Sequence, residues 1–316
     1  MDEYRSCREA FTEALRELAT LDKEIVVLSS DARGSCSLNE FVDHLPEQFV
    51  EVGIAEQNLV GIAAGLAAVG KKPYVCAPAC FIATRSLEQI KVDVAYSGKN
   101  VTILGVSGGI SYGALGASHH TLHDIAALRA IPGIMVLLPS DAVQTQAILK
   151  AVSTTDQPVY IRIGRNKIPP IYSQRQDIEP FVFGKATLLQ DGEDITLVAC
   201  GELVYHALQA AEQLTQKGVS ARVLDMASLK PFDVDAIVAA ATETKAIVTV
   251  EEHSINGGLG ATVSQIVCRH KPVPVRTLGL PDQFLITGTS LELFAHYGLD
   301  ATGIASEALD LLASLE

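Results

Sequence analysis

The chain has 316 residues, of which 48% are hydrophobic and 19% charged, and its formal net charge is −13. This length suits two medium-sized domains, and the high apolar content leads us to expect that another subunit covers part of the surface. No basic stripe and no apolar run of about 20 residues occurs, which argues against nucleic-acid binding and against membrane spanning. The charged, amphipathic N-terminus does not look like a signal peptide, so we expect a cytoplasmic protein.

Short β-branched runs alternate with amphipathic helical stretches along the first 170 residues. Continuous apolar strands that alternate with helices predict a parallel sheet covered on both faces. The expected strands are 24–31, 73–77, 101–107, 134–139 and 158–164. The expected helices are 3–20, 56–69, 81–97, 121–130 and 141–152.

A second series of the same kind follows a polar, proline-containing stretch at 168–184. Its expected strands are 195–201, 221–227, 246–252 and 274–280. Its expected helices are 202–217, 233–242, 258–269 and 304–314. We therefore predict an α/β protein with two doubly wound domains and largely parallel sheets, at 1–170 and 185–316, joined by a linker at 171–184.

The stretch EVGIAEQNLVGIAAGLA places one acid, Glu56, at the head of a segment that is apolar on every side from Leu59 onward. A carboxylate in such surroundings is costly unless it is paired, hydrogen-bonded or protonated. Glu56 is therefore either a solvated first-turn acid, favoured by the helix dipole, or a buried carboxyl group needed for chemistry.

The glycine-containing stretch VSGGISYGALGASHH follows an expected strand, as ligand-binding loops do in open α/β sheets. It matches neither the dinucleotide-binding fingerprint nor a nucleotide-triphosphate loop. A single histidine of this loop is the best candidate to reach a substrate, and a plain helix cap by Ser118 or Thr121 is the alternative. Adjacent histidines converge poorly on one ion, so we predict no metal site in this chain.

Other polar residues follow the first and last expected strands of the same domain. Asp31 and Ser35 come after the strand at 24–31, and Arg165 comes after the strand at 158–164. The carboxyl ends of parallel strands are where such sheets bind ligands. Arg165 after Gly164 is placed to clamp a phosphate, or else it is solvated at a domain edge.

Four stretches taken together resemble the C-terminal half of transketolase: IAEQNLVGIAAGLA, the loop that ends in GASH, LRAIPGIMVLLPSDA and EEHSINGGLG. The likeness covers essentially the whole chain, as a pyrimidine-binding domain followed by the family's C-terminal domain. The GDG motif by which the family's other half binds the cofactor diphosphate and Mg²⁺ does not occur. The chain thus resembles one subunit of a split transketolase, whose N-terminal partner subunit would carry the diphosphate-binding domain and hold Mg²⁺.

The resemblance implies a cofactor site for thiamine diphosphate. The family's matching glutamate, here Glu56, hydrogen-bonds N1′ of the aminopyrimidine ring. Phe81 in CAPACFIATR is the aromatic residue left to stack on that ring, and Asp31 matches an acid beside the cofactor across the subunit interface.

The resemblance also implies a substrate site and a reaction. His119 matches the residue that meets the substrate, while Arg165, Ser35 and Arg5 match residues that bind the sugar phosphate. The implied reaction transfers a two-carbon ketol unit from a ketose phosphate to an aldose phosphate. Where related chains carry a Glu–Asp pair, this one has Ala114 and Leu115. We therefore expect an atypical donor that is branched, deoxygenated or otherwise lacks the usual hydroxyl pattern.

Other assignments stay open at this point. The β subunit of a 2-oxo acid dehydrogenase E1 has the same two domains, although Gln57 and Asn58 after the glutamate look more like transketolase. A fragment of 1-deoxyxylulose-5-phosphate synthase and a noncatalytic relative are further alternatives. If the active site lies at an interface, we expect a heterotetramer with the partner, and a homodimer when this subunit is alone.

Overall fold

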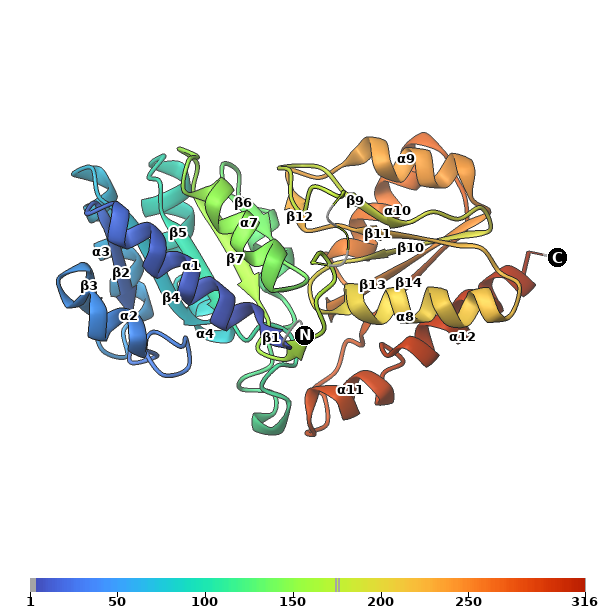
Figure 1. Cartoon of the computed structure of the whole chain (residues 1–316), viewed down its shortest axis with the longest axis horizontal. Helices are drawn as coiled ribbons and strands as arrows, with labels where there is room; N and C mark the ends of the chain where they lie inside the picture. Colours follow the sequence, from blue (N-terminus) through green and yellow to red (C-terminus); the bar gives the residue numbers. More distant parts are fainter. Residues whose placement is uncertain (1–3, 174, 176, 316) are drawn as a thin grey trace.

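In the computed structural model, which describes residues 4–173, 175 and 177–315, the chain forms two lobes side by side (Figure 1). The N-terminal lobe, blue to green, contains the first sheet, and the C-terminal lobe, yellow to red, contains the second. This arrangement confirms the predicted α/β class with two largely parallel sheets.

The first sheet has seven strands in the order β12-β6-β7-β5-β4-β2-β3. From one edge to the other these are Ser228–Lys230, Met135–Leu137, Val159–Ile163, Thr102–Val106, Lys72–Pro78, Ile25–Ser29 and Phe49–Glu51. All neighbours are parallel except β12, which comes from the C-terminal half of the chain and pairs antiparallel with β6. The two lobes therefore share one sheet, which the sequence did not predict.

The second sheet has five strands in the order β14-β13-β10-β11-β9. These are Val275–Leu280, Ala246–Ser254, Ile195–Ala199, Ala221–Asp225 and the antiparallel edge strand Thr187–Gln190. A short antiparallel ribbon pairs β1 (Arg5–Ser6) with β8 (Lys167–Ile168). Its second strand brings the end of the N-terminal lobe back beside the start of the chain.

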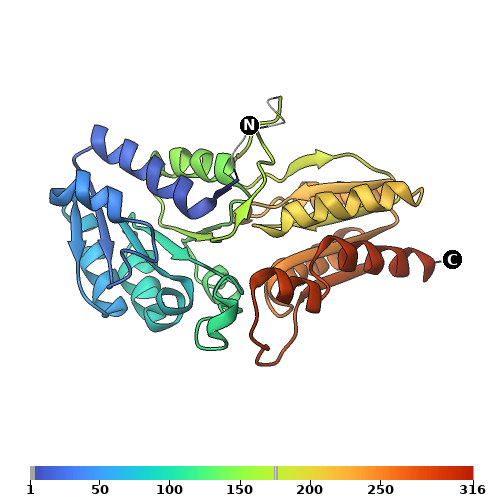
Figure 2. The same ribbon diagram turned by 60° about the horizontal axis from the view of Figure 1, so that its bottom comes forward.

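Helices cover both faces of each sheet (Figures 1 and 2). Those of the N-terminal lobe are α1 Cys7–Leu21, α2 Asn39–His44, η1 Pro46–Gln48, α3 Glu56–Ala68, α4 Ala79–Arg85, α5 Leu87–Gln89, the π-helix η2 Ile90–Tyr96, η3 Gly113–Leu115, α6 Asp124–Arg129 and α7 Ala142–Val152. Those of the C-terminal lobe are α8 Leu203–Gln216, α9 Val234–Glu243, α10 Leu259–His270, α11 Ser290–His296 and α12 Ala301–Ala313. No helix in the described residues is long and apolar enough to span a bilayer.

Two predicted helices of the N-terminal lobe are wrong in extent. The helix expected at 81–97 is broken, because α4 ends before Ser86. The Ser86 hydroxyl donates to the Ile82 carbonyl at 2.6 Å, and a π-helix begins at Ile90. The helix expected at 121–130 starts only at Asp124, because the Thr121 N–H is held by the Gly109 carbonyl at 2.7 Å. In the first predicted helix, residue 3 lies outside the described residues, and α1 begins at Cys7 after the capping residue Ser6.

One hydrophobic core runs through both lobes. It joins Leu59 of α3 and Ile82 of α4 to Ile237 of α9 and Val263 of α10, and all four side chains are fully buried. Burial of apolar surface stabilises by about 25 cal/mol per Å², so a core shared in this way opposes separation of the lobes.

A buried cluster of charged side chains also bridges the lobes. Arg162 of β7 lies with its Nε 3.3 Å from Asp124 Oδ2, and its Nη2 donates to the Glu252 carbonyl at 2.6 Å. Burial raises the pKa of Glu251 to about 7 and moves the pKa values of Glu202 and Glu252 upward as well. These acids therefore keep protons in the folded chain that they lose on unfolding at neutral pH.

This cluster predicts that stability falls as the pH rises. An acid whose pKa is raised by folding contributes its full stabilisation of the folded state at pH values below its pKa in the unfolded chain. That contribution is lost as the pH rises through its pKa in the folded chain. Each proton retained by the folded chain makes stability fall by about 1.4 kcal/mol per pH unit. We expect the Tm to drop by several degrees between about pH 6.5 and 8.5, where the folded chain loses these protons.

Calorimetric scans of Glu252→Gln, compared with the exposed control Glu212→Gln, check this expectation. The amide of Glu252→Gln can still accept from the Ile110 N–H but does not titrate, so its pH slope should be shallower. Equal slopes for wild type and both variants would contradict the assignment.

Candidate active site

A pocket of about 370 Å³ opens at the carboxyl edge of the first sheet, where the loops after β2, β3, β4 and β5 meet. This edge is where ligands bind in open parallel sheets. Its walls are formed by Ser30, Asp31, Ala32, Ser35, Ile54, Glu56, Pro78, Phe81, Arg85, Tyr112, Leu115 and His119. Five of the residues predicted from the sequence thus share one pocket: Asp31, Ser35, Glu56, Phe81 and His119.

Glu56 is the first residue of α3 and is 4% exposed, so its interpretation as a solvated first-turn acid is wrong. The carboxylate is not alone, because Arg85 Nη1 donates to Glu56 Oε1 at 2.8 Å. A buried carboxylate is tolerated when it is paired and hydrogen-bonded in this way.

Arg85 is a site residue that the sequence reasoning missed. Its guanidinium lies over the ring of Phe81, with Cζ 3.9 Å from the ring centroid. The two residues are four apart on α4, a spacing that places side chains on the same face of a helix. That spacing, together with the preference of cations for helix C-termini, is a signal that could have found Arg85.

His119 packs into the pocket between two aromatic rings. Its ring centroid lies 5.3 Å from that of Phe81 and 5.5 Å from that of Tyr112, both in edge-to-face geometry. Ser118 Oγ lies 3.0 Å from His119 Nδ1, and α6 begins only after His123, so the alternative of a helix cap by Ser118 or Thr121 is wrong.

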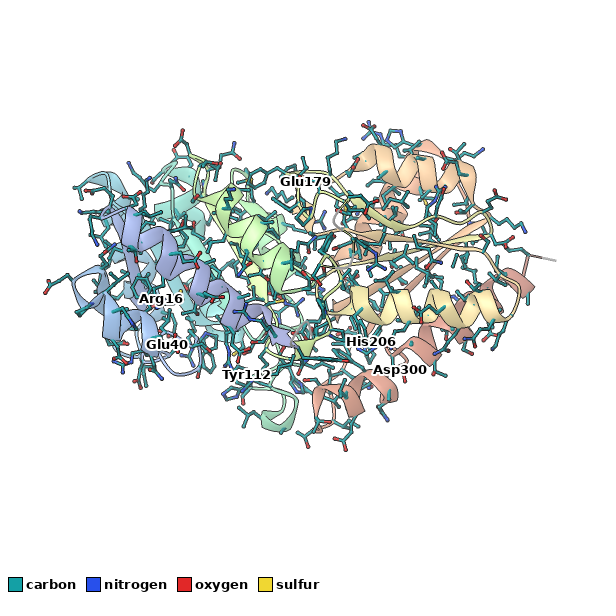
Figure 3. The ribbon with its side chains drawn as sticks, viewed as in Figure 1. Arg16, Glu40, Tyr112, Glu179, His206 and Asp300 are labelled. Carbon is teal, nitrogen blue, oxygen red and sulfur yellow. The ribbon has the colours of Figure 1, made fainter. Side chains whose placement is uncertain are left out.

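Arg165 is connected to the pocket through Tyr112. Its Cζ lies 4.8 Å from the centroid of the Tyr112 ring. The Tyr112 ring contacts His119, which in turn contacts Phe81. Tyr112 lies on the loop at the lower centre of Figure 3, between the two lobes. Arg85, Phe81, His119, Tyr112 and Arg165 thereby form a continuous row of side chains in contact.

The loop after β2 supplies Asp31 and Ser35. Asp31 has a left-handed backbone (φ 54°), and its N–H donates to Glu51 Oε1 at 2.7 Å. A non-glycine residue in this region is strained and persists only where its surroundings hold it, as at many functional sites. Arg5, by contrast, pairs with Glu13 along α1 and lines a different hollow of the surface, so the structure does not bring it to the pocket.

The C-terminal lobe fixes the loop that carries His119. The Ile110 N–H donates to Glu252 Oε1 at 2.7 Å, and Ser290 Oγ donates to the Ile110 carbonyl at 3.2 Å. Gly109 makes this approach possible, since a Cβ there would overlap both the Glu252 carboxylate and the Arg162 guanidinium. The loop therefore depends on both lobes for its conformation.

The pocket fits an aminopyrimidine ring. The guanidinium of Arg85 already occupies the place of such a ring, because this flat, nitrogen-bearing group lies over Phe81 and donates to Glu56. Ser30 Oγ is buried in the wall without a hydrogen-bond partner in the described chain, so a bound polar group can satisfy it. Among the described residues, no three His, Cys, Asp or Glu side chains are grouped to hold a metal ion.

Residues 3–170 match the transketolase pyrimidine-binding domain, and residues 184–304 match the transketolase C-terminal domain. The chain belongs to the transketolase family. The pyrimidine-binding domain of this family implies thiamine diphosphate as the cofactor.

Individual relatives agree with this assignment. The chain is 57% identical over 307 residues to an apulose-4-phosphate transketolase subunit of Phocaeicola vulgatus, covering 97% of each chain. It is 37% identical to a 6-deoxy-6-sulfo-D-fructose transketolase subunit of Clostridium sp. (strain MSTE9), covering 95% of this chain and 92% of that one. A solved structure described as "Split gene transketolase, inactive beta4 tetramer" superposes with a TM-score of 0.87 at 38% identity and covers 98% of this chain and 99% of that chain. The predicted resemblance to the C-terminal subunit of a split transketolase is thus confirmed.

The loop that carries His119 depends on close packing at Gly109. A methyl group added at Gly109 should therefore lower the free energy of unfolding considerably. Gly109→Ala combines positive φ (61°) with overlap against Glu252, whereas Gly98→Ala has nearly the same φ (60°) in open space. We expect Gly109→Ala to lose about 1–3 kcal/mol more unfolding free energy than Gly98→Ala. Urea titrations measure both, and equal losses would show that the loop does not depend on this contact.

Proposed function

We propose that this chain is the transketolase subunit that binds the aminopyrimidine of thiamine diphosphate and the sugar substrates. With an N-terminal subunit that carries the diphosphate-binding domain and Mg²⁺, it transfers a two-carbon ketol unit from a ketose phosphate to an aldose phosphate. The observation that carries this proposal is that Glu56, Phe81 and His119 share one pocket in a chain 57% identical to a transketolase subunit.

Thiamine diphosphate, when bound, supplies the nucleophilic carbon and the electron sink that cleavage next to a ketose carbonyl requires. The role of Glu56 is to exchange a proton with N1′ of the aminopyrimidine through its carboxyl group. Its burial supports this role, because a carboxyl group shielded from water interacts more strongly with a bound partner. Phe81 offers a ring face for stacking, and Asp31 offers a further acid on the same wall.

The substrate side lies along the row from His119 to Arg165. With Ser118 Oγ at Nδ1, Nε2 of His119 is left to meet an oxygen of the sugar. Arg165, stacked on Tyr112, is assigned to the phosphate, with Ser35 on the facing loop. Arg5 stays a prediction as a phosphate ligand, since reaching the pocket would require release from Glu13.

The donor is proposed to be an atypical ketose phosphate. Leu115, 55% exposed, places an apolar side chain on the pocket wall, at a position where the family motif implies an acid. A hydroxyl group facing this wall would lose its hydrogen bond on binding, so a donor without that hydroxyl is favoured. The substrate named for the 57%-identical relative, apulose 4-phosphate, is the first donor to test.

The proposed assembly is a cytoplasmic heterotetramer of two copies of each subunit. Ile54 at the rim of the pocket is 73% exposed, and an apolar rim beside a site is typical of a surface covered by a partner. This subunit alone is proposed to form a homodimer.

Glu56→Gln should lower kcat of the two-subunit enzyme by about a hundredfold to ten-thousandfold, because the amide cannot exchange a proton. The exposed Glu88→Gln on α5 is the matched control and should retain wild-type turnover. Steady-state assay of ketol transfer measures both variants. Wild-type turnover by Glu56→Gln would refute the proposed role.

The assembled enzyme should use apulose 4-phosphate with a kcat/KM at least about tenfold above that for xylulose 5-phosphate. Leu115→Asp should narrow this ratio, since it returns an acid to the pocket wall. Assays with glyceraldehyde 3-phosphate and ribose 5-phosphate as acceptors measure the ratio. Equal efficiency with both donors would overturn the proposal of an atypical substrate.

A further inference from the structure

Among the described residues, Arg85 is the only arginine or lysine on the wall of the pocket. It contacts the two residues on which the proposed aminopyrimidine site depends, with Nη1 2.8 Å from Glu56 Oε1 and Cζ 3.9 Å from the Phe81 ring centroid. A guanidinium in this position uses the carboxylate and the ring face at the same time.

The side chain is placed to leave this position. Arg85 ends α4, and the helical path is interrupted at Ser86, where the backbone leaves the helical region (φ −111°, ψ 21°). The Arg85 side chain is 43% exposed, whereas that of Glu56 is 5% exposed. Glu56 is its only ion-pair partner among the described residues. The guanidinium can move from this position into water, while the buried Glu56 carboxyl group needs a new partner when it does.

We infer that Arg85 is a displaceable occupant of the aminopyrimidine site, which leaves Glu56 and Phe81 when the cofactor binds. The inference rests on the proposed function, because it takes Glu56 and Phe81 as the aminopyrimidine ligands. A guanidinium donates N–H groups to a carboxylate and stacks on an aromatic ring, whereas an aminopyrimidine stacks on the same ring face and shares one proton between its N1′ and the carboxyl group. Both groups use the Phe81 ring face and the Glu56 carboxyl group, so one has to leave before the other can bind.

The exchange has a physical rationale in the burial of Glu56. A buried carboxylate without a partner is costly, so an empty pocket around Glu56 would destabilise the chain until assembly is complete. Arg85 supplies a partner in that state, and the ring nitrogen supplies one afterwards. The consequence is that Arg85 competes with the cofactor and weakens its apparent affinity.

The test is the affinity of the assembled two-subunit enzyme for thiamine diphosphate in the presence of Mg²⁺, measured by titration calorimetry. Arg85→Met keeps the length of the side chain but removes the charge and the donors. We expect it to bind the cofactor about three- to thirtyfold more tightly than wild type. This range corresponds to the free energy of one ion pair and one cation–ring contact, which only the wild-type enzyme has to give up on binding. Arg269→Met, an exposed position on α10, controls for the loss of one positive charge toward an anionic ligand.

The sign of the change decides the outcome. Loss of a positive charge by itself weakens binding of an anionic cofactor, so tighter binding by Arg85→Met relative to Arg269→Met supports displacement. Weaker or equal binding by Arg85→Met overturns it. Failure of the wild-type complex to bind thiamine diphosphate would refute the proposed function, and this inference with it.

A crystal structure of the wild-type enzyme with thiamine diphosphate gives a second, independent measurement. We expect Arg85 to have left Glu56 in that structure, with the aminopyrimidine ring on Phe81. A bound ring beside an intact Arg85–Glu56 pair would overturn the inference while leaving the proposed function in place.

Discussion

The guanidinium of Arg162 is the interaction on which the arrangement of the site depends. It lies between the lobes, beside Asp124 and against the Glu252 carbonyl, and is 5% exposed. A buried arginine is stable only where acceptors surround it, and here those acceptors come from both lobes. Its Nη2 also reaches the Thr121 carbonyl, so the end of the His119 loop is held by the same group that joins the lobes. Contacts between the lobes therefore fix the ends of the loop that carries His119.

The pocket itself follows from the way the strands end. Asp31 after β2 and Ser107 after β5 both have left-handed backbone conformations, with φ of 54° and 58°. These turns direct the following loops across the edge of the sheet. α3 after β3 and α4 after β4 then present Glu56 and Phe81 from the two strands that flank β2, so residues from separate parts of the chain face one another. The strain at the two turns is held by a scaffold that is otherwise regular.

The sequence predicted the parts of this structure that depend on local pattern. The central strands are apolar on both faces, and such runs are recognisable without a partner. Glu56, Phe81 and His119 were assigned by resemblance, and they converge because the carboxyl ends of parallel strands lie at one edge of the sheet. The pairing of Arg85 with Glu56 was missed, because it depends on where α4 stops, and the π-helix after it has no clear sequence signal. Arg5 was assigned by resemblance, but its side chain follows α1 to Glu13, a local contact that a motif does not reveal.

The strand β12 has a consequence for how the chain can be divided. Although it lies in the half that matches the transketolase C-terminal domain, it completes the first sheet by pairing with β6. Cutting the chain between the two matched regions would leave the β6 edge without its neighbour, and such bare edges recruit strands from other molecules. The boundary between the two matched family domains is thus not a boundary of the first sheet. A dissection that respects the fold has to keep Ser228–Lys230 with the N-terminal lobe.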